Sequence, residues 1–410
     1  DRNMPLIRPF AGLRPVPARA GDVIAPPYDV LNSEEARQRA AGRPWSFLHI
    51  SKAEIDLPEA TDPYDASVYA RAALNLQAMI EQGILQRDDQ ACYYVYRLIM
   101  GDHTQTGLVA VASVADYDTN RIRKHEFTRP AKEDDRVRQI EALNAQTGPV
   151  LLAYKSQAGI DRLIESVTTH TPDVDLKADD GIAHTFWVVK DQALIDELTA
   201  GFDGMEALYI ADGHHRSAAA SRVAAVLEAG PDDMSGYFLS VIFPHKQMQI
   251  LDYNRVVRDL NGLSVSELLE NVATAFDVEE QQAAVSPSRP GEFGMYLAGR
   301  WYRLTINADR LSQDPVARLD VSLLAANLLQ PVLGISDPRT DPRIDFVGGI
   351  RGLGELEKRV DSGEMAVAFS LFPTSMEDLM AVADAGKVMP PKSTWFEPKL
   401  VDGLVSHLLD

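Results

Sequence analysis

The sequence predicts a mixed α+β protein built as two lobes, and three observations support this prediction. Segments of strand character alternate with segments of helical periodicity, and tight turns join several strand segments into antiparallel hairpins. The 410 residues exceed what one hydrophobic core usually serves. The hydrophobic fraction of 45% and the charged fraction of 24% are ordinary for a globular chain. A doubly wound parallel sheet fits this pattern less well.

Helices are predicted where apolar residues recur at helical spacing between capping and stop signals. Residues 32–41 begin with Asn32 or Ser33 as a plausible N-cap, and residues 65–83 end at Gly83. Further helices are expected over 132–145, 160–168, 217–229, 264–276, 321–329, 352–361 and 375–386.

Strands are predicted from runs of β-branched and aromatic residues. Cys92–Met100 and residues 107–114 form one hairpin around Gly101-Asp102, and residues 294–306 form another. Single strands are expected over 150–154, 186–189, 206–211, 237–243 and 365–372. The proline-rich stretch 7–30 is expected to be a rigid, ordered loop, and residues 389–400 are expected to be irregular.

The expected organisation has a main lobe over residues 1–240 that holds the functional pocket. A second α+β lobe follows over residues 241–388. The last segment, 389–410, could return to the pocket of the main lobe.

Composition narrows the classes of partner. The formal net charge is −20, and the Lys and Arg residues are scattered, so binding along DNA is not expected. No run approaches the roughly 18 apolar residues of a membrane span, and residues 1–16 lack the apolar core of a signal peptide. Cys92 is the only cysteine, which excludes an internal disulfide. A cytoplasmic location is therefore expected.

The segment 212–216, Asp-Gly-His-His-Arg, is the main candidate site because it joins a short apolar strand to an alanine-rich helix. A helix N-terminus stabilises an anion, Gly213 lets a ligand approach the backbone, and His214, His215 and Arg216 add donors. Asp212 could orient a histidine, hold a metal or cap the helix. We predict a phosphate-binding turn here; the alternative is a capped helix with two surface histidines.

Three further sets of residues are candidates for the same site. Glu126 could act as a general base, and Glu133, Asp134 and Asp135 could hold Mg²⁺; alternatively, they form a solvated charged segment. Tyr28 and Asp29 follow Pro26-Pro27, which would hold them rigidly beside a ligand. Lys392, in the polar segment before Trp395, could close over an anion, or the segment could pack Trp395 into the core.

Motifs of other enzyme classes are absent. The sequence has no Walker A loop, no Gly-x-Gly-x-x-Gly after a strand, no Gly-x-Ser-x-Gly elbow and no His-Glu-x-x-His.

The segments 8–10, 25–30, 124–126, 133–136, 210–216 and 389–394, in this order, resemble the prokaryotic domain-of-unknown-function family ten-fifteen over nearly the whole chain. The turn at 212–216 is also similar to the phosphate-binding turn of the ParB/sulfiredoxin superfamily. That similarity implies a core of this type around residues 206–229. Sulfiredoxins carry a catalytic cysteine in the turn, where this chain has Gly213-His214-His215, and the partition proteins carry a basic DNA-binding module that is not seen here. The free-serine kinase branch has a closely similar Asp-Gly-His-His-Arg turn.

This resemblance implies phosphoryl transfer from ATP or ADP, with Mg²⁺, to a small hydroxyl metabolite, with free serine as the leading candidate. Glu126 or Asp212 would take the hydroxyl proton, and the 212–216 turn would hold the phosphates. The alternatives are a non-catalytic nucleotide-binding regulator and a phosphatase that uses the same phosphate cradle. The sequence leaves open the acceptor, the choice of nucleotide and the oligomeric state.

Overall fold

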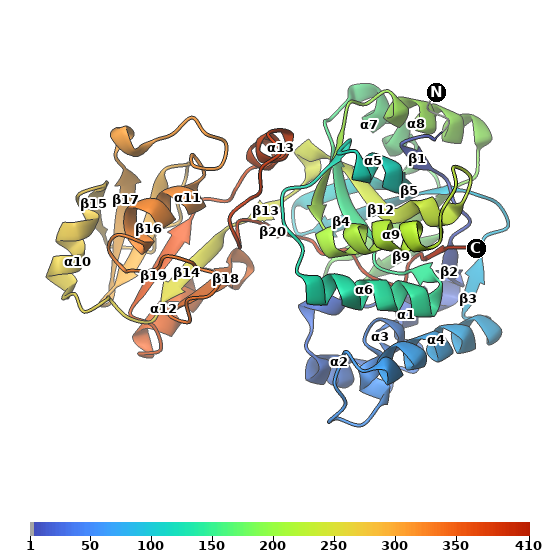
Figure 1. Cartoon of the computed structure of the whole chain (residues 1–410), viewed down its shortest axis with the longest axis horizontal. Helices are drawn as coiled ribbons and strands as arrows, with labels where there is room; N and C mark the ends of the chain where they lie inside the picture. The colour runs from blue at the N-terminus through green and yellow to red at the C-terminus, as the bar shows by residue number, and fades with distance from the viewer. Residues whose placement is uncertain (1–3) are drawn as a thin grey trace. The chain divides into compact units, whose positions relative to one another are not determined.

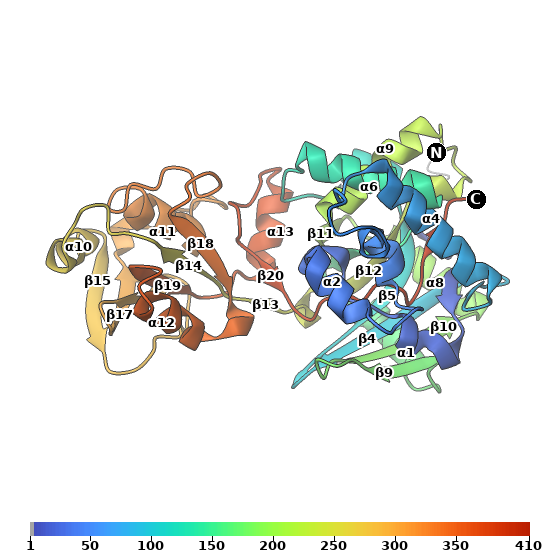
Figure 2. The same cartoon turned by 90° about the horizontal axis from the view of Figure 1, so that it is seen from below.

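The computed structural model describes residues 4–410 and has the expected α+β architecture with mixed sheets. The chain divides into two compact units (Figures 1 and 2): the first runs to Met248 and resumes with Pro398–Asp410, and the second is Gln249–Glu397. The expected boundary at 240/241 lies too early, because strand β12 (Tyr237–Pro244) runs inside the sheet of the first unit. The expected boundary at 388/389 is also too early, because β20 (Trp395–Phe396) pairs with β13 (Ile250–Leu251) in the second unit.

The first unit is built on a nine-stranded mixed sheet in which β12 lies parallel to β8 and antiparallel to β5. The predicted hairpin is its centre, with β4 and β5 joined by the Gly101 turn. Along the sheet the strands are β6 (Ile122–Arg123), β11 (Leu208–Asp212), β8 (Val150–Tyr154), β12, β5 (His103–Ser113), β4 (Tyr93–Met100), β10 (Ala183–Val189) and β9 (Val174–Lys177), while β1 (Ile7–Arg8) pairs with β5.

Helices pack on this sheet through apolar stripes. One core joins the sheet to α7 (Ala158–Val167), α8 (Gln192–Asp203) and the inner residues of α9 (His214–Val226), with α5 (Val114–Asp118) at its edge. A second core is formed by the N-terminal helices, drawn in blue in Figures 1 and 2. These are α1 (Ala20–Val23), α2 (Ser33–Ala40), α3 (Leu48–Ser51) and α4 (Ala66–Glu81), together with the pair β2 (Leu13–Pro15) and β3 (Leu85–Arg87).

Helix α6 (Pro130–Leu143) positions the functional site because it packs against both α4 and α9. A small core of Val137, Ile140, Ala219 and Val223 with Leu409 joins α6, α9 and the end of the chain. The end of the chain is fixed by β21 (His407–Leu408), which pairs with β7 (Ala145–Gln146) directly after α6.

The second unit contains a six-stranded antiparallel sheet with a core on each face. In sheet order the strands are β15 (Phe276–Gln281), β17 (Arg300–Ile306), β16 (Glu292–Leu297), β19 (Val367–Leu371), β14 (Tyr253–Val257) and β18 (Ile344–Gly348). The larger core includes residues of α10 (Val265–Val272), α11 (Asp320–Leu324), the π-helical turn η7 (Ala325–Leu329) and α13 (Met376–Asp384), and the smaller one includes residues of α12 (Leu353–Asp361).

Most predicted helices agree with the structure to within about two residues at each end, and two differ by more. Helix α9 begins at His214 instead of residue 217, so the histidines belong to its first turn. Helix α10 ends at Val272 instead of residue 276, because Phe276 starts β15 and enters the core. Within residues 4–410, none of the helices combines the length and the apolar character that a membrane crossing requires.

Candidate functional site

The 212–216 segment forms a sharp turn from strand β11 into helix α9. Gly213 adopts φ 97°, which L side chains rarely adopt, and a Cβ there would lie 3.3 Å from both the guanidinium carbon of Arg216 and the Cα of Val150. The Asp212 carboxylate accepts the Gly213 N–H at 2.9 Å, and no side chain caps the first turn of α9. The positive end of this helix therefore faces the site without a capping carboxylate or hydroxyl.

His214 is buried and held in one tautomer. Its Nε2 accepts the backbone N–H of His125 at 3.3 Å, so the proton of the neutral ring lies on Nδ1. Burial holds the pKa of His214 well below its usual value, and the nearby cations Lys124 and Arg216 lower it further. Nδ1 lies 3.4 Å from the carboxylate of Glu126 without the geometry of a hydrogen bond.

The two other histidines of the region are positioned by backbone contacts. His125 donates from Nε2 to the carbonyl of Ala211 at 3.2 Å, and its ring meets that of His214 edge to face at 4.5 Å. His215 accepts the N–H of Arg129, the residue before α6, through Nε2 at 3.0 Å. His215 thus joins the starts of α6 and α9. Burial lowers the pKa of both His125 and His215, so both rings are neutral at pH 7.

Arg216 and Arg136 form the cationic part of the site. Arg216 donates to the carbonyl of Pro149, and Arg136 donates to Asp135 at 2.6 Å while its guanidinium lies 3.8 Å from the centre of the Tyr28 ring. Burial alone would lower the pKa of Arg216, but nearby negative charges, Asp29 first among them, raise it overall. Both arginines are fully charged at pH 7.

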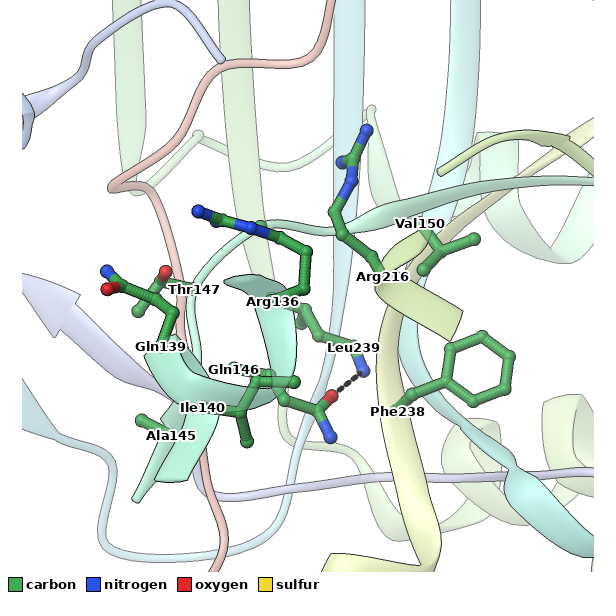
Figure 3. Close-up of a pocket in the computed structure, with 11 residues that line it drawn as sticks. Arg136, Gln139, Ile140, Ala145, Gln146, Thr147, Val150, Arg216, Phe238 and Leu239 are labelled. Atoms are coloured by element: carbon green, nitrogen blue, oxygen red, sulfur yellow. Dashed lines mark hydrogen bonds between the residues drawn. The ribbon is translucent and has the colours of Figure 1, made fainter. Parts of the chain in front are cut away.

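A small cavity of about 20 Å³, which is room for one water molecule, lies beneath the arginines. In Figure 3 the two guanidinium groups point away from its apolar side at Ile140 and Phe238. The amide oxygen of Gln146 accepts the N–H of Leu239 there at 2.7 Å. The apolar parts of the two arginine side chains therefore line the cavity, and their charged ends lie on the side away from Ile140 and Phe238.

The structure brings several predicted residues together. Tyr28 and Asp29 belong to a short helix, η2 (Tyr28–Val30), and interact with Arg136 and Arg216, with Asp29 exposed to solvent. Glu126 is more than half exposed beside His214. Burial raises the pKa of Asp212, but Arg216 and Lys399 more than offset this, so the net shift is downward and Asp212 stays ionised.

The predicted metal ligands do not form one cluster. Glu133 and Asp134 both bind Arg222, at 3.3 and 2.6 Å, and Asp135 binds Arg136 and the hydroxyl of Tyr69. Within the part of the chain that the structure describes, no group of three His, Cys, Asp or Glu side chains is arranged to hold a metal ion.

Lys392 belongs to the second unit, where it adopts φ 58° directly before Ser393. Its predicted role at the phosphate stays a prediction.

Arg136, Arg216, Asp29 and Asp402 form a group of charged side chains that we call the arginine cluster. Two of its members, Arg136 and Asp402, were not predicted as site residues from the sequence. Arg136 lies within the 133–136 motif, which was considered for its carboxylates alone. Asp402 is buried and interacts electrostatically with Arg216, Asp29 and Arg136. No pattern around Asp402 marks it, because only the return of the chain end brings it to the arginines.

These features define an α+β protein with an uncapped helix N-terminus beside two clustered arginines. Residues 7–322 match the model of a family described as a protein of unknown function (DUF1015). The match covers most of the chain, and the chain belongs to this family. No curated protein matches it.

Among solved structures, the chain is similar to a free serine kinase in complex with AMP, at 14% identity and a TM-score of 0.36, covering 72% of this chain and 91% of that one. It is also similar to a conserved hypothetical protein from Pyrococcus furiosus, at 16% identity and a TM-score of 0.36, with coverage of 73% and 95%. A third is SbnI with a C-terminal truncation from Staphylococcus aureus, at 14% identity and a TM-score of 0.38, with coverage of 72% and 86%.

Proposed function

We propose that this protein binds ATP or ADP at the 212–216 turn and transfers a phosphoryl group to a small hydroxyl metabolite, with free serine as the leading candidate. The observation that carries the proposal is the first turn of α9, which follows Gly213 at φ 97° and has no side-chain cap. Its backbone N–H groups and the charge of Arg216 suit the terminal phosphates of a nucleotide.

The chemistry needs positioning and charge stabilisation more than covalent catalysis. The hydroxyl oxygen of the acceptor attacks the terminal phosphorus, and the bond from that phosphorus to the bridging oxygen breaks. Arg216 and the helix N-terminus stabilise the negative charge on the transferring group. The bridging oxygen stays with the departing nucleotide, which is ADP when ATP is the donor and AMP when ADP is the donor.

Glu126 is the better of the two predicted proton acceptors. Its carboxylate is partly exposed, so it can reach an acceptor, and it lies 3.4 Å from Nδ1 of His214. Asp212 is less suitable, because its lowered pKa makes it a weaker base and its carboxylate already accepts the Gly213 N–H. The hydroxyl proton therefore passes to Glu126.

Mg²⁺ is part of the proposal as the counter-ion of the nucleotide phosphates. Glu133 and Asp134 are engaged by Arg222, and Asp135 is engaged by Arg136, so these carboxylates are not a ready-made site for it. We therefore place the ion on the phosphates, where it would neutralise charge.

The test is formation of a phosphorylated product from ATP or ADP and a panel of hydroxyl metabolites that starts with serine. We expect Glu126→Gln to abolish turnover and to leave nucleotide binding intact. Nucleotide binding without turnover for any acceptor would instead identify a regulator. Release of phosphate from phosphoserine in the absence of nucleotide would identify a phosphatase.

A further inference from the structure

Asp402 enters the arginine cluster from the returning end of the chain, and its backbone is fixed on both sides. Asp402 and Ala25 exchange two backbone hydrogen bonds, of 2.8 and 3.1 Å. Gly403 follows at φ 99°, and a Cβ there would lie 3.2 Å from the side chain of Phe47. The carboxylate of Asp402 is therefore held in place beside the segment that carries Tyr28 and Asp29.

The surroundings of this carboxylate are unusual for a buried acid. Only 2% of Asp402 is exposed. Arg216 of α9 and Asp402 approach the same point beside Gly148, because a Cβ on that glycine would lie 3.8 Å from Nη1 of Arg216 and 4.0 Å from Oδ1 of Asp402. The charge of Asp402 also interacts with Arg136 of α6 and Asp29 of η2. The pKa of Asp402 is raised to about 7, because the effect of burial, with a contribution from Asp29, exceeds the lowering by Arg216 and Arg136. Asp402 thus depends on Arg216 as its main counter-charge.

The wider cluster is close to charge balance before any ligand binds. Tyr28, Asp135, Asp212 and Lys399 belong to the same set, and the neutral side chains of His214, His215 and Tyr69 also lie within reach of the two arginines. A phosphate that approaches Arg216 adds negative charge to this set and competes for the same guanidinium. A buried carboxylate that loses its counter-charge is far less stable ionised than protonated.

We propose that Asp402 is a positioning residue of the nucleotide site that takes up one proton when a phosphate binds beside Arg216. This inference rests on the proposed function, because it requires an anionic phosphate at the 212–216 turn. While Asp402 is ionised it holds Arg216 in place, and once it is neutral the charge of Arg216 is available to the phosphate.

The test is calorimetric titration with ADP and Mg²⁺ at about pH 8, in two buffers that differ in ionisation enthalpy. The nucleotide phosphates are fully ionised at this pH, so proton uptake reports on the protein. We expect uptake of up to about one proton per ADP and an affinity that falls about tenfold for each pH unit above 7.

Asp402→Asn keeps the shape of the side chain and cannot ionise. We expect this variant to bind ADP without proton uptake, up to about tenfold more tightly than the wild type at about pH 8, and without the pH dependence. Asp179→Asn, which changes an exposed carboxylate of the same unit, is the matched control and should keep the wild-type uptake.

The outcomes separate the two proposals. ADP binding by the wild type without proton uptake, or uptake that persists in Asp402→Asn, overturns the role of Asp402 and leaves the proposed function standing. Absence of ADP binding in the wild type overturns both. If Asp402→Asn does not fold, the wild-type uptake and its pH dependence still decide the question.

Discussion

The backbone N–H of His125 donates a hydrogen bond of 3.3 Å to Nε2 of His214, and this contact ties two segments 89 residues apart into one site. Both rings are buried, and His214 can accept this bond only while it is neutral. The same bond places the proton of the neutral ring on Nδ1, which lies 3.4 Å from the carboxylate of Glu126.

We expect His214→Ala to destabilise the protein by about 2 kcal/mol, because it leaves the buried N–H of His125 without its acceptor and opens a cavity. Differential scanning calorimetry measures the effect. His103→Ala, at the first residue of strand β5, is a control that should change stability much less. Equal losses in the two variants would contradict the structural role given to His214.

Stability should fall as the solution is acidified. Burial lowers the pKa of His184 and of His407 to about 4 in the folded protein, whereas an unfolded histidine titrates near 6.5. The unfolded state therefore binds more protons below about pH 6.5, and stability is lost as the pH falls from there toward 4.

The expected slope is up to about 1.4 kcal/mol per pH unit for each of these histidines. Chemical unfolding between about pH 7 and pH 5 measures it. His184→Gln should flatten the dependence, and an unchanged slope in that variant would show that His184 is not the group responsible.

Even a methyl side chain at position 213 should lower the stability of the folded protein. We expect Gly213→Ala to cost about 1–2 kcal/mol, because φ 97° is unfavourable for alanine and the new methyl group would press on Arg216 and Val150. Gly159→Ala, at an open position in helix α7, is the matched control and should stabilise by about 0.5–1 kcal/mol. Thermal unfolding of both variants measures these changes in stability. An unchanged stability of Gly213→Ala would argue against the geometry of this turn.

Local sequence signals predicted several elements of the fold. Asn32, one of the two N-caps that the sequence offered, forms a full capping box with Glu35, and the hairpin around Gly101 has the expected partners. The strand predicted over 206–211 and the helix that follows it are joined at Gly213. A glycine between a strand and a helix is typical of such a sharp turn. Each of these features depends on residues that are close in sequence.

The arginine cluster could not be predicted in the same way, because it depends on contacts between distant segments. Asp402 lies 186 residues beyond Arg216, and the pairing of β21 with β7 together with the bridges from Ser406 to Leu13 and from Asp402 to Ala25 brings it back. The acidic run 133–135 indicated a metal site by composition alone. The structure shows Glu133 and Asp134 engaged by Arg222, which depends on how α6 packs against α9, and Asp135 engaged by its neighbour Arg136.

The most direct test of the central claim is calorimetric titration of ADP with Mg²⁺ into the wild type, Arg216→Ala and Arg222→Ala. Arg222 lies on the same helix, half exposed and paired with Asp134, and serves as the matched control. We predict that Arg216→Ala weakens binding about tenfold to a hundredfold and that Arg222→Ala binds like the wild type. Equal binding by all three proteins, or no binding by the wild type, would contradict a nucleotide site at this turn.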